Sequence, residues 1–280
     1  MKKIITSNCW TSHRVLCAIL LCIAALWTVP GTARAQLKIG GFDASRGGFE
    51  SLAPGEDSAL AIDITAAYPG TTFSFSNTLT PSFLAGVNAV ILGVATTETS
   101  AITPLTSSEQ TALQNFILNG GTALIFTDND TFDPNAPAVN ASFLTPFGLS
   151  ATGTLAGLVD TPILNPSGPL TGPFIPANEF TTNEPGWFNY TGAGTVLAQF
   201  SPTEPAIDYF APGTLGPRSG TAVFFSDSDA MVFGDALSRS NLNLILNTLA
   251  TVPEPSTWSM MAVGGLALLG VTLRRRHHAG

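Results

Sequence analysis

Cysteine and histidine are nearly absent from the central part of this 280-residue sequence, which has three of each in total. All six stand near the two ends, as Cys9, His13, Cys17, Cys22, His277 and His278. A central segment without thiols forms no disulfide and must rely on its hydrophobic core. It also lacks the usual nucleophile–base pairs of hydrolytic enzymes and the usual ligands of zinc.

Basic residues are scarce as well. Residues 36–252 comprise 217 residues with eighteen acidic and four basic side chains, a net charge of −14. Such a surface repels the phosphate backbone of nucleic acids, so nucleic acid is not an expected partner. The charge suits cations or solubility outside the cell, and the length suits one well-buried domain.

The amino-terminal end has the features of a processing segment. A positively charged start precedes an apolar stretch from Val15 to Val29, and Ala33 and Ala35 supply the small side chains that signal peptidase accepts. We therefore predict a signal peptide over residues 1–35. The alternative is an uncleaved membrane anchor, for which the apolar stretch is short.

The carboxyl-terminal end has a different order of parts. Pro-Glu-Pro at residues 253–255 precedes an uncharged run at 258–273 and then three arginines. As a helix this run spans about 24 Å, slightly less than the hydrocarbon core of a bilayer. The prolines disfavour helix before the run, and the arginines favour a cytoplasmic end. The sequence predicts a transmembrane helix at 258–273.

This order of parts, from residue 252 to residue 276, resembles the PEP-CTERM sorting signal of Gram-negative bacteria. The resemblance implies recognition by exosortase, a membrane protease-transpeptidase, in a host that makes exopolysaccharide and forms biofilms. It implies that exosortase recognises Pro253, Glu254 and Pro255. It also implies that a stop-transfer cluster is formed by Arg274, Arg275 and Arg276. The expected location is transiently the inner membrane, then the cell envelope, the outer surface or the outside. The alternative is an ordinary single-span anchor.

Strands alternate with helices between the two ends. Predicted strands cover residues 37–43, 72–76, 89–94, 122–128 and 221–226, and predicted helices begin near Ser58, after Thr106 and before Leu242. Thr106 and Glu109 form a capping box that marks the second helix start. This alternation predicts an α/β fold for residues 36–251, with a mainly parallel sheet between two helix layers.

Residues 131–218 differ, because they hold thirteen of the twenty prolines. We predict long Pro/Gly-rich surface loops here, with a strand pair at 196–200 and 206–210 that belongs to the same sheet. The alternative is a separate small domain. Trp187, Phe188 and Tyr190 cluster within this segment. They either stack on sugar rings or pin the loop to the core.

Two stretches are similar to the class I glutamine-amidotransferase-like superfamily. Residues 116–126 carry one of them, and residues 225–247 look like the non-catalytic relatives of that fold. The resemblance implies a flavodoxin-like, three-layer architecture. Catalytic members need a cysteine with a histidine beside it, and residues 36–252 contain neither, so glutaminase activity is not implied.

Five aspartates follow predicted strands, as Asp43, Asp128, Asp130, Asp227 and Asp229. Strand ends of an open α/β sheet converge at the crevice where ligands usually bind. Carboxylates gathered there favour a hard cation such as Ca²⁺ or Mg²⁺. The alternative is that they cap turns and helices. Paired carboxylates also suit glycoside hydrolysis.

These observations predict a non-enzymatic, exported surface or matrix protein that binds cations or polysaccharide. Two other functions remain open at this stage. One is a secreted hydrolase that uses the strand-end aspartates, and the other is a membrane-tethered binding subunit of an envelope complex. A deep pocket with converging carboxylates would favour the hydrolase, and a large exposed apolar patch would favour a protein partner.

Overall fold

The computed structural model describes residues 36–47, 51–54, 58–94, 103–165, 168–189, 192–231 and 239–252. The predicted signal peptide (1–35), the sorting motif and the predicted transmembrane helix (258–273) lie outside these residues. Within the described ranges, no helix is long and apolar enough to cross a membrane.

A seven-stranded sheet forms the centre of the domain, in the order β2-β1-β3-β4-β11-β10-β9. Its strands are β1 (Lys38–Phe42), β2 (Thr72–Ser76), β3 (Ala89–Gly93), β4 (Thr122–Phe126), β9 (Thr195–Ser201), β10 (Glu204–Phe210) and β11 (Ala222–Phe225). The first five strands in the sheet order pair in parallel, and β10 and β9 add an antiparallel pair. The predicted mainly parallel sheet is confirmed, and so is the predicted strand pair.

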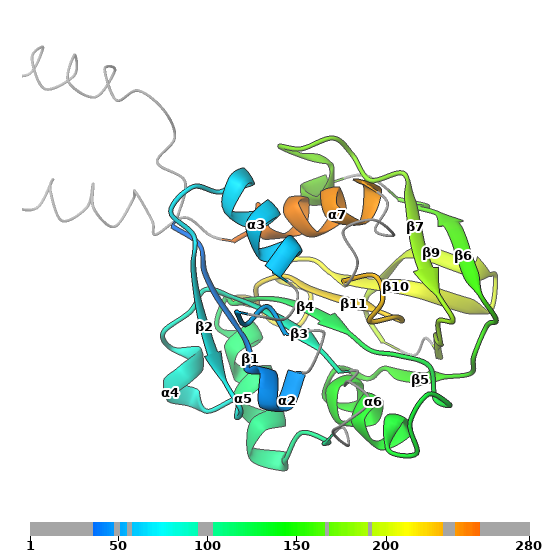
Figure 1. The fold of residues 1–280 in the computed structure, drawn as a ribbon, viewed down its shortest axis with the longest axis horizontal. Helices are drawn as coiled ribbons and strands as arrows, with labels where there is room; N and C mark the ends of the chain where they lie inside the picture. The colour runs from blue at the N-terminus through cyan, green and yellow to red at the C-terminus, as the bar shows by residue number, and fades with distance from the viewer. Residues whose placement is uncertain are drawn as a thin grey trace, which may run out of the picture. The chain divides into compact units, whose positions relative to one another are not determined.

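Helices cover both faces of the sheet (Figure 1). They are α2 (Ala44–Gly47), α3 (Ser58–Ala67), α4 (Pro81–Leu84), α5 (Ser107–Leu118), α6 (Ala136–Leu144) and α7 (Arg239–Leu249), with the 3-10 turns η2 (Thr145–Phe147) and η3 (Gly168–Thr171). One hydrophobic cluster joins the sheet to α3 and α7, and a second joins it to α4, α5 and α6. Every residue of β3 and β4 is buried, as strands covered on both faces must be.

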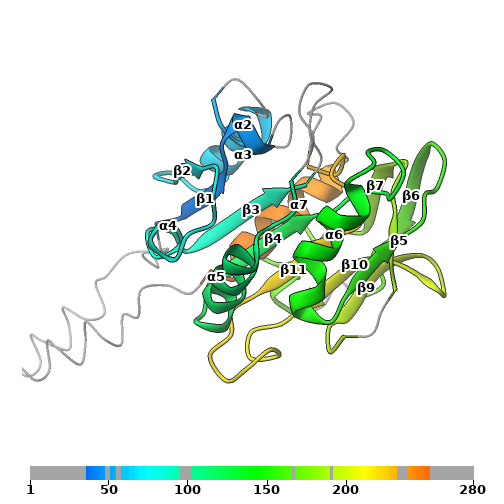
Figure 2. The same ribbon diagram turned by 90° about the horizontal axis from the view of Figure 1, so that it is seen from below.

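The Pro-rich segment 131–218 is more structured than the sequence predicts. It contains α6 and four short strands, β5 (Ser150–Thr152), β6 (Leu158–Pro162), β7 (Glu179–Asn183) and β8 (Trp187–Asn189). β5 pairs with β8, and β6 with β7, as two small antiparallel sheets beside the main one (Figure 2). The prediction of long surface loops was therefore wrong for these five elements. At α6 the reason is that Pro137 lies in the first turn of the helix, where proline is tolerated.

The capping box of α5 is confirmed, and an ion pair connects it to α2, the short helix that follows β1. Glu109 accepts hydrogen bonds from the backbone and hydroxyl of Thr106 and from the Leu79 amide, and it forms an ion pair with Arg46. Burial alone would raise the pKa of Glu109, but Arg46 and these donors lower it to about 2. The ion pair between Arg46 and Glu109 therefore holds α2 next to the start of α5.

Replacing Glu109 with glutamine should destabilise the domain by roughly 1–3 kcal/mol at neutral pH, because buried donors lose a charged acceptor. Because folding lowers the pKa of Glu109, its carboxylate stabilises the fold at pH values above the ordinary pKa of 4.5. This stabilisation is lost as the pH falls toward about 2. Urea unfolding should therefore show wild type and variant converging in acid. The exposed Asn115→Ala, on the same helix, is the matched control and should change little. Equal stability of wild type and Glu109→Gln at neutral pH would contradict this account.

Candidate functional site: buried carboxyl groups at the ends of β4 and β11

β4 and β11 are neighbours in parallel, so the residues that follow them meet at one end of the sheet. Three of the five predicted aspartates come together there. Asp128 follows β4, whereas Asp227 and Asp229 follow β11. Asp227 is fully buried, Asp128 is 8% exposed and Asp229 is half-buried. The crevice expected from the topology is therefore filled by protein.

Each oxygen of Asp227 already accepts hydrogen bonds from the chain. The Asp229 amide donates to Oδ1 at 2.9 Å, and the Asn183 amide and the Thr182 hydroxyl donate to Oδ2. The Asn183 side chain also donates to Asp229. The last residues of β7 thus close the crevice over β11.

Asp128 is enclosed in the same way from the other side. The Asn129 amide donates to its Oδ1 at 2.6 Å, and the Ser228 hydroxyl donates to its Oδ2. Gly186 lies against the backbone here, where a Cβ atom would come within 3.2 Å of Asn129 Cα, so a side chain would push the β7–β8 connection away. A close backbone approach explains the glycine at this position.

Burial and neighbouring negative charge raise the pKa of both buried acids. Burial is the main reason that the pKa of Asp128 rises from 3.8 to about 7, and the Asp229 charge adds to it. Burial, followed by the Asp128 charge, holds the pKa of Asp227 well above its ordinary range. At neutral pH the pair therefore keeps a proton that exposed aspartates would release.

The other two predicted aspartates do not join the buried pair. Asp43 accepts hydrogen bonds from the amide and hydroxyl of Ser45 and so caps the short helix α2. β3 separates β1 from β4, which places Asp43 about 10 Å away across the sheet. Asp130 borders the cluster, because the Asn140 side chain of α6 donates to Asp130 at 3.3 Å and to the Asp128 carbonyl. For Asp43 the helix-capping interpretation fits better than a shared site.

The expected cation site stays a prediction. Among the described residues, no group of three or more acidic, histidine or cysteine side chains is arranged to hold a metal ion. The reason is visible at Asp128 and Asp227, whose oxygens accept protein donors. A cation would have to replace those donors.

Several residues of this cluster were missed by sequence reasoning. Thr182 and Asn183 belong to the segment that was interpreted as loops, and Asn140 to a helix that was not predicted. Ser228, between Asp227 and Asp229, was the one available signal. A further buried acid, Asp208 of β10, was also missed; burial raises its pKa to about 7, and its Oδ2 has no hydrogen-bond partner in the structure.

The aromatic cluster favours the packing interpretation over sugar binding. Phe188 is fully buried in the core and has no free face for a sugar ring. Trp187 lies against Gly153, where no side chain would fit beneath the indole. Tyr190 lies outside the described residues.

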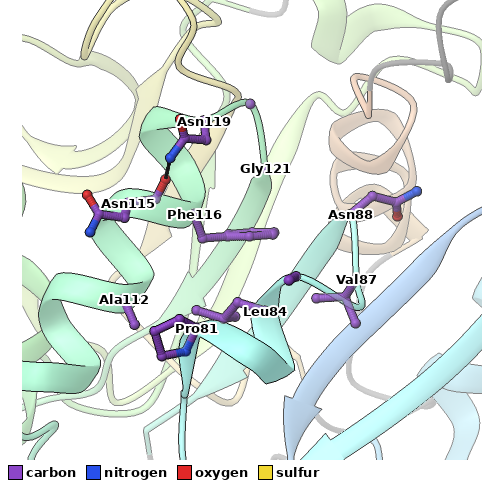
Figure 3. Close-up of a pocket in the computed structure, with 11 residues that line it drawn as sticks. Pro81, Leu84, Val87, Asn88, Ala112, Asn115, Phe116, Asn119 and Gly121 are labelled. Carbon is purple, nitrogen blue, oxygen red and sulfur yellow. Dashed lines mark hydrogen bonds between the residues drawn. The ribbon is translucent and has the colours of Figure 1, made fainter.

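Two of the cavities among the described residues lie elsewhere, and no aspartate lines either of them. One, of about 570 Å³, lies between α4 and α5, with Leu84 and Val87 on one side and Phe116 on the other (Figure 3). Phe116 points into it from α5 and also packs, partly buried, against the hydrophobic cluster on this face of the sheet. The other, of about 770 Å³, lies between α3 and β2 and is lined mainly by apolar side chains. Neither cavity has the converging carboxylates that a hydrolase of this kind requires.

Comparison with known proteins identifies the tail and the general fold. Residues 251–276 match a family model described as the PEP-CTERM protein-sorting motif. The chain therefore carries the motif of an exported protein that is processed by exosortase, anchored transiently in the membrane and sorted to the envelope or surface. No curated protein sequence matches the chain.

Among solved structures, the chain is similar to the mmIFT52 N-terminal domain, with 12% identity and a TM-score of 0.54 over 78% of this chain and 98% of that one. A putative thua-like protein from Bacteroides uniformis has 15% identity and a TM-score of 0.47, covering 82% of this chain and 96% of that one. The β-galactosidase from Bacillus circulans has 13% identity and a TM-score of 0.48, covering 79% of this chain and 31% of that one. Of these three structures, only the mmIFT52 domain has a TM-score above 0.5, and at 12% identity the similarity concerns the fold alone. These neighbours do not support the resemblance to glutamine-amidotransferase-like domains.

Proposed function

We propose that this protein is a non-enzymatic surface or matrix component of a Gram-negative bacterium, released from the inner membrane by exosortase and retained in a biofilm. The sorting motif at 251–276 carries the proposal. This motif implies an exported protein that exosortase sorts. The resemblance also implies a host that makes exopolysaccharide and forms biofilms.

The geometry of the strand-end acids supports a role without catalysis. A general acid or base must reach a proton on its substrate, whereas Asp227 is fully buried and donors from β7 occupy its oxygens. Asp128 is similarly occupied by Ser228 and Asn129. The pair suits a structural role, in which it joins β4, β11 and β7. A surface domain without disulfides benefits from such an internal network.

Replacing Pro253 and Pro255 together with alanine should block maturation in the native host, because exosortase is expected to recognise the extended Pro-Glu-Pro peptide. The measurement is intact mass combined with fractionation, in strains with and without exosortase. Wild type should lose both ends and leave the inner membrane, and the variant should keep its tail there. Thr251→Ala, at the start of the matched residues, is the control and should mature normally. Normal maturation of the proline variant would overturn the proposal.

A further inference from the structure

The two processed ends of this chain join the domain at the same end of the sheet (Figure 1). Gln36 donates from its side chain to the Gly70 carbonyl, in the turn between α3 and β2. Tyr68, at the start of that turn, donates to the Leu246 carbonyl in the last part of α7. The signal peptide therefore precedes, and the sorting tail follows, residues that surround one turn.

This end of the sheet has a charge opposite to that of the domain as a whole. We call it the amino-terminal end, because the parallel strands begin there; it comprises residues 36–38, 67–72, 86–89, 119–122, 211–222 and 249–252. These segments contain no aspartate or glutamate, and they carry two exposed basic residues, Lys38 and Arg218. The ion pair found among the described residues joins Arg46 to Glu109, so it leaves both of these cations free for an external anion.

Apolar groups lie near the last turn of α7 and beside the starts of β3 and β4. Ile175 is 74% exposed, the largest value among the exposed large apolar side chains of the described residues. Its carbonyl accepts a hydrogen bond from Asn247, which fixes it next to the last turn of α7. The cavity between α4 and α5 also reaches this end, where Val87 and Gly121 precede β3 and β4 (Figure 3).

The length of the tail keeps this surface near the bilayer before processing. Five residues, 253–257, separate Val252 from the predicted transmembrane helix. Fully extended, they reach at most about 18 Å. The strand-end acids lie at the opposite end of the sheet, where the negative charge of a lipid surface would not repel them at close range.

We propose that the amino-terminal end of the sheet docks on an anionic lipid surface while the tail still holds the protein in the membrane. Lys38 and Arg218 bind phosphate headgroups, and Ile175 inserts among them. Docking then presents both peptides to proteases that act at the membrane surface. This inference rests on the proposed function, because it needs a tail that inserts.

The test uses the full chain in vesicles of phosphatidylcholine with or without phosphatidylglycerol. The native Cys9, Cys17 and Cys22 are replaced by serine. A fluorophore is attached either at Thr214→Cys, in the loop before β11, or at Thr203→Cys, in the turn between β9 and β10 at the opposite end. Quenching by nitroxide-headgroup lipids reports how near each label is to the bilayer.

Strong quenching at position 214 and weak quenching at position 203, in anionic vesicles, is the expected result. Lys38→Gln with Arg218→Gln should weaken the docking equilibrium about fivefold per charge, as should added salt. Ile175→Ser should weaken it further. Leu158→Ser is the matched control, because Leu158 is 66% exposed and pairs with Asn183 near the acids; it should change nothing.

Two failures can be told apart. If the full chain does not float with the vesicles, the tail does not insert, and both the proposed function and the docking are overturned. If it floats but the two labels are quenched equally, or the charge variants behave like wild type, only the lipid-docking surface is overturned.

Discussion

Asp128→Asn should make the mature domain more stable than wild type at alkaline pH and nearly equal to it in acid. The asparagine retains the Oδ1 acceptor for the Asn129 amide. Its Nδ2 cannot accept the hydrogen bond that the Ser228 hydroxyl donates to Oδ2 in the wild type, so this hydroxyl must turn and accept from the amide instead. The asparagine therefore reproduces the neutral form that burial favours, without the group that ionises. Asp227 should also become easier to ionise, because the neighbouring charge is removed.

The direction follows from proton binding. A carboxyl group whose pKa is raised by folding binds its proton more tightly in the folded chain than in the unfolded chain. Its contribution to the unfolding free energy is therefore complete at pH values below the ordinary pKa, and it is lost as the pH rises toward the raised pKa. For Asp128 the window runs from 3.8 to about 7. The wild-type loss attributable to this group is on the order of 4–5 kcal/mol, because each pKa unit corresponds to about 1.4 kcal/mol.

Urea unfolding of the mature domain across this pH range measures the effect. Asp160→Asn is the matched control, since Asp160 is exposed on β6 and its removal should leave the wild-type pH dependence intact. If Asp128→Asn keeps the full wild-type slope, the buried pair does not set the pH dependence, and its structural role must be abandoned.

Phe225→Ala should cost about 3–5 kcal/mol of unfolding free energy, which is a large part of the stability of a domain of this size. Phe225 is 1% exposed and stacks on Phe126 of the neighbouring strand, with ring centroids 4.2 Å apart. Phe180 of β7 packs against the same ring at 6.0 Å. The substitution leaves a cavity where the sheet meets the strands that cover the acids.

The matched control is Phe132→Ala, because Phe132 is 38% exposed and should contribute little. Urea unfolding at a pH near 5 keeps the buried acids protonated and isolates the packing effect. A loss below about 1 kcal/mol for Phe225→Ala would show that this part of the core is not packed as described.

The sequence was most informative where the signal is local. Thr106 and Glu109 mark a helix start by their spacing alone, and the apolar runs of β3 and β4 indicate strands buried on both faces. The prolines of residues 131–218 were misleading, since proline marks the first turn of a helix as well as a loop. Phe143 of α6 and Phe188 of β8 are fully buried although no pattern in their segments predicts it.

The candidate site shows the same division. Asp128 and Asp227 were identified from the sequence because both follow strands, and strand order then decided that they meet while Asp43 does not. Their partners Thr182 and Ser228 are 45 or more positions away from the acid that each contacts. Contacts of that sequence separation leave no periodic signature.

The sequence by itself determined where this protein is sent. The sorting motif at residues 251–276 is defined by the linear order of its residues, so it can be identified without the fold. Tertiary structure alone decided what the aspartates do, because ionisation depends on burial and on which donors surround each oxygen. It also decided that Gln36 and the last turn of α7 lie at the end of the sheet that has basic but no acidic side chains, since only the fold brings them to the same turn.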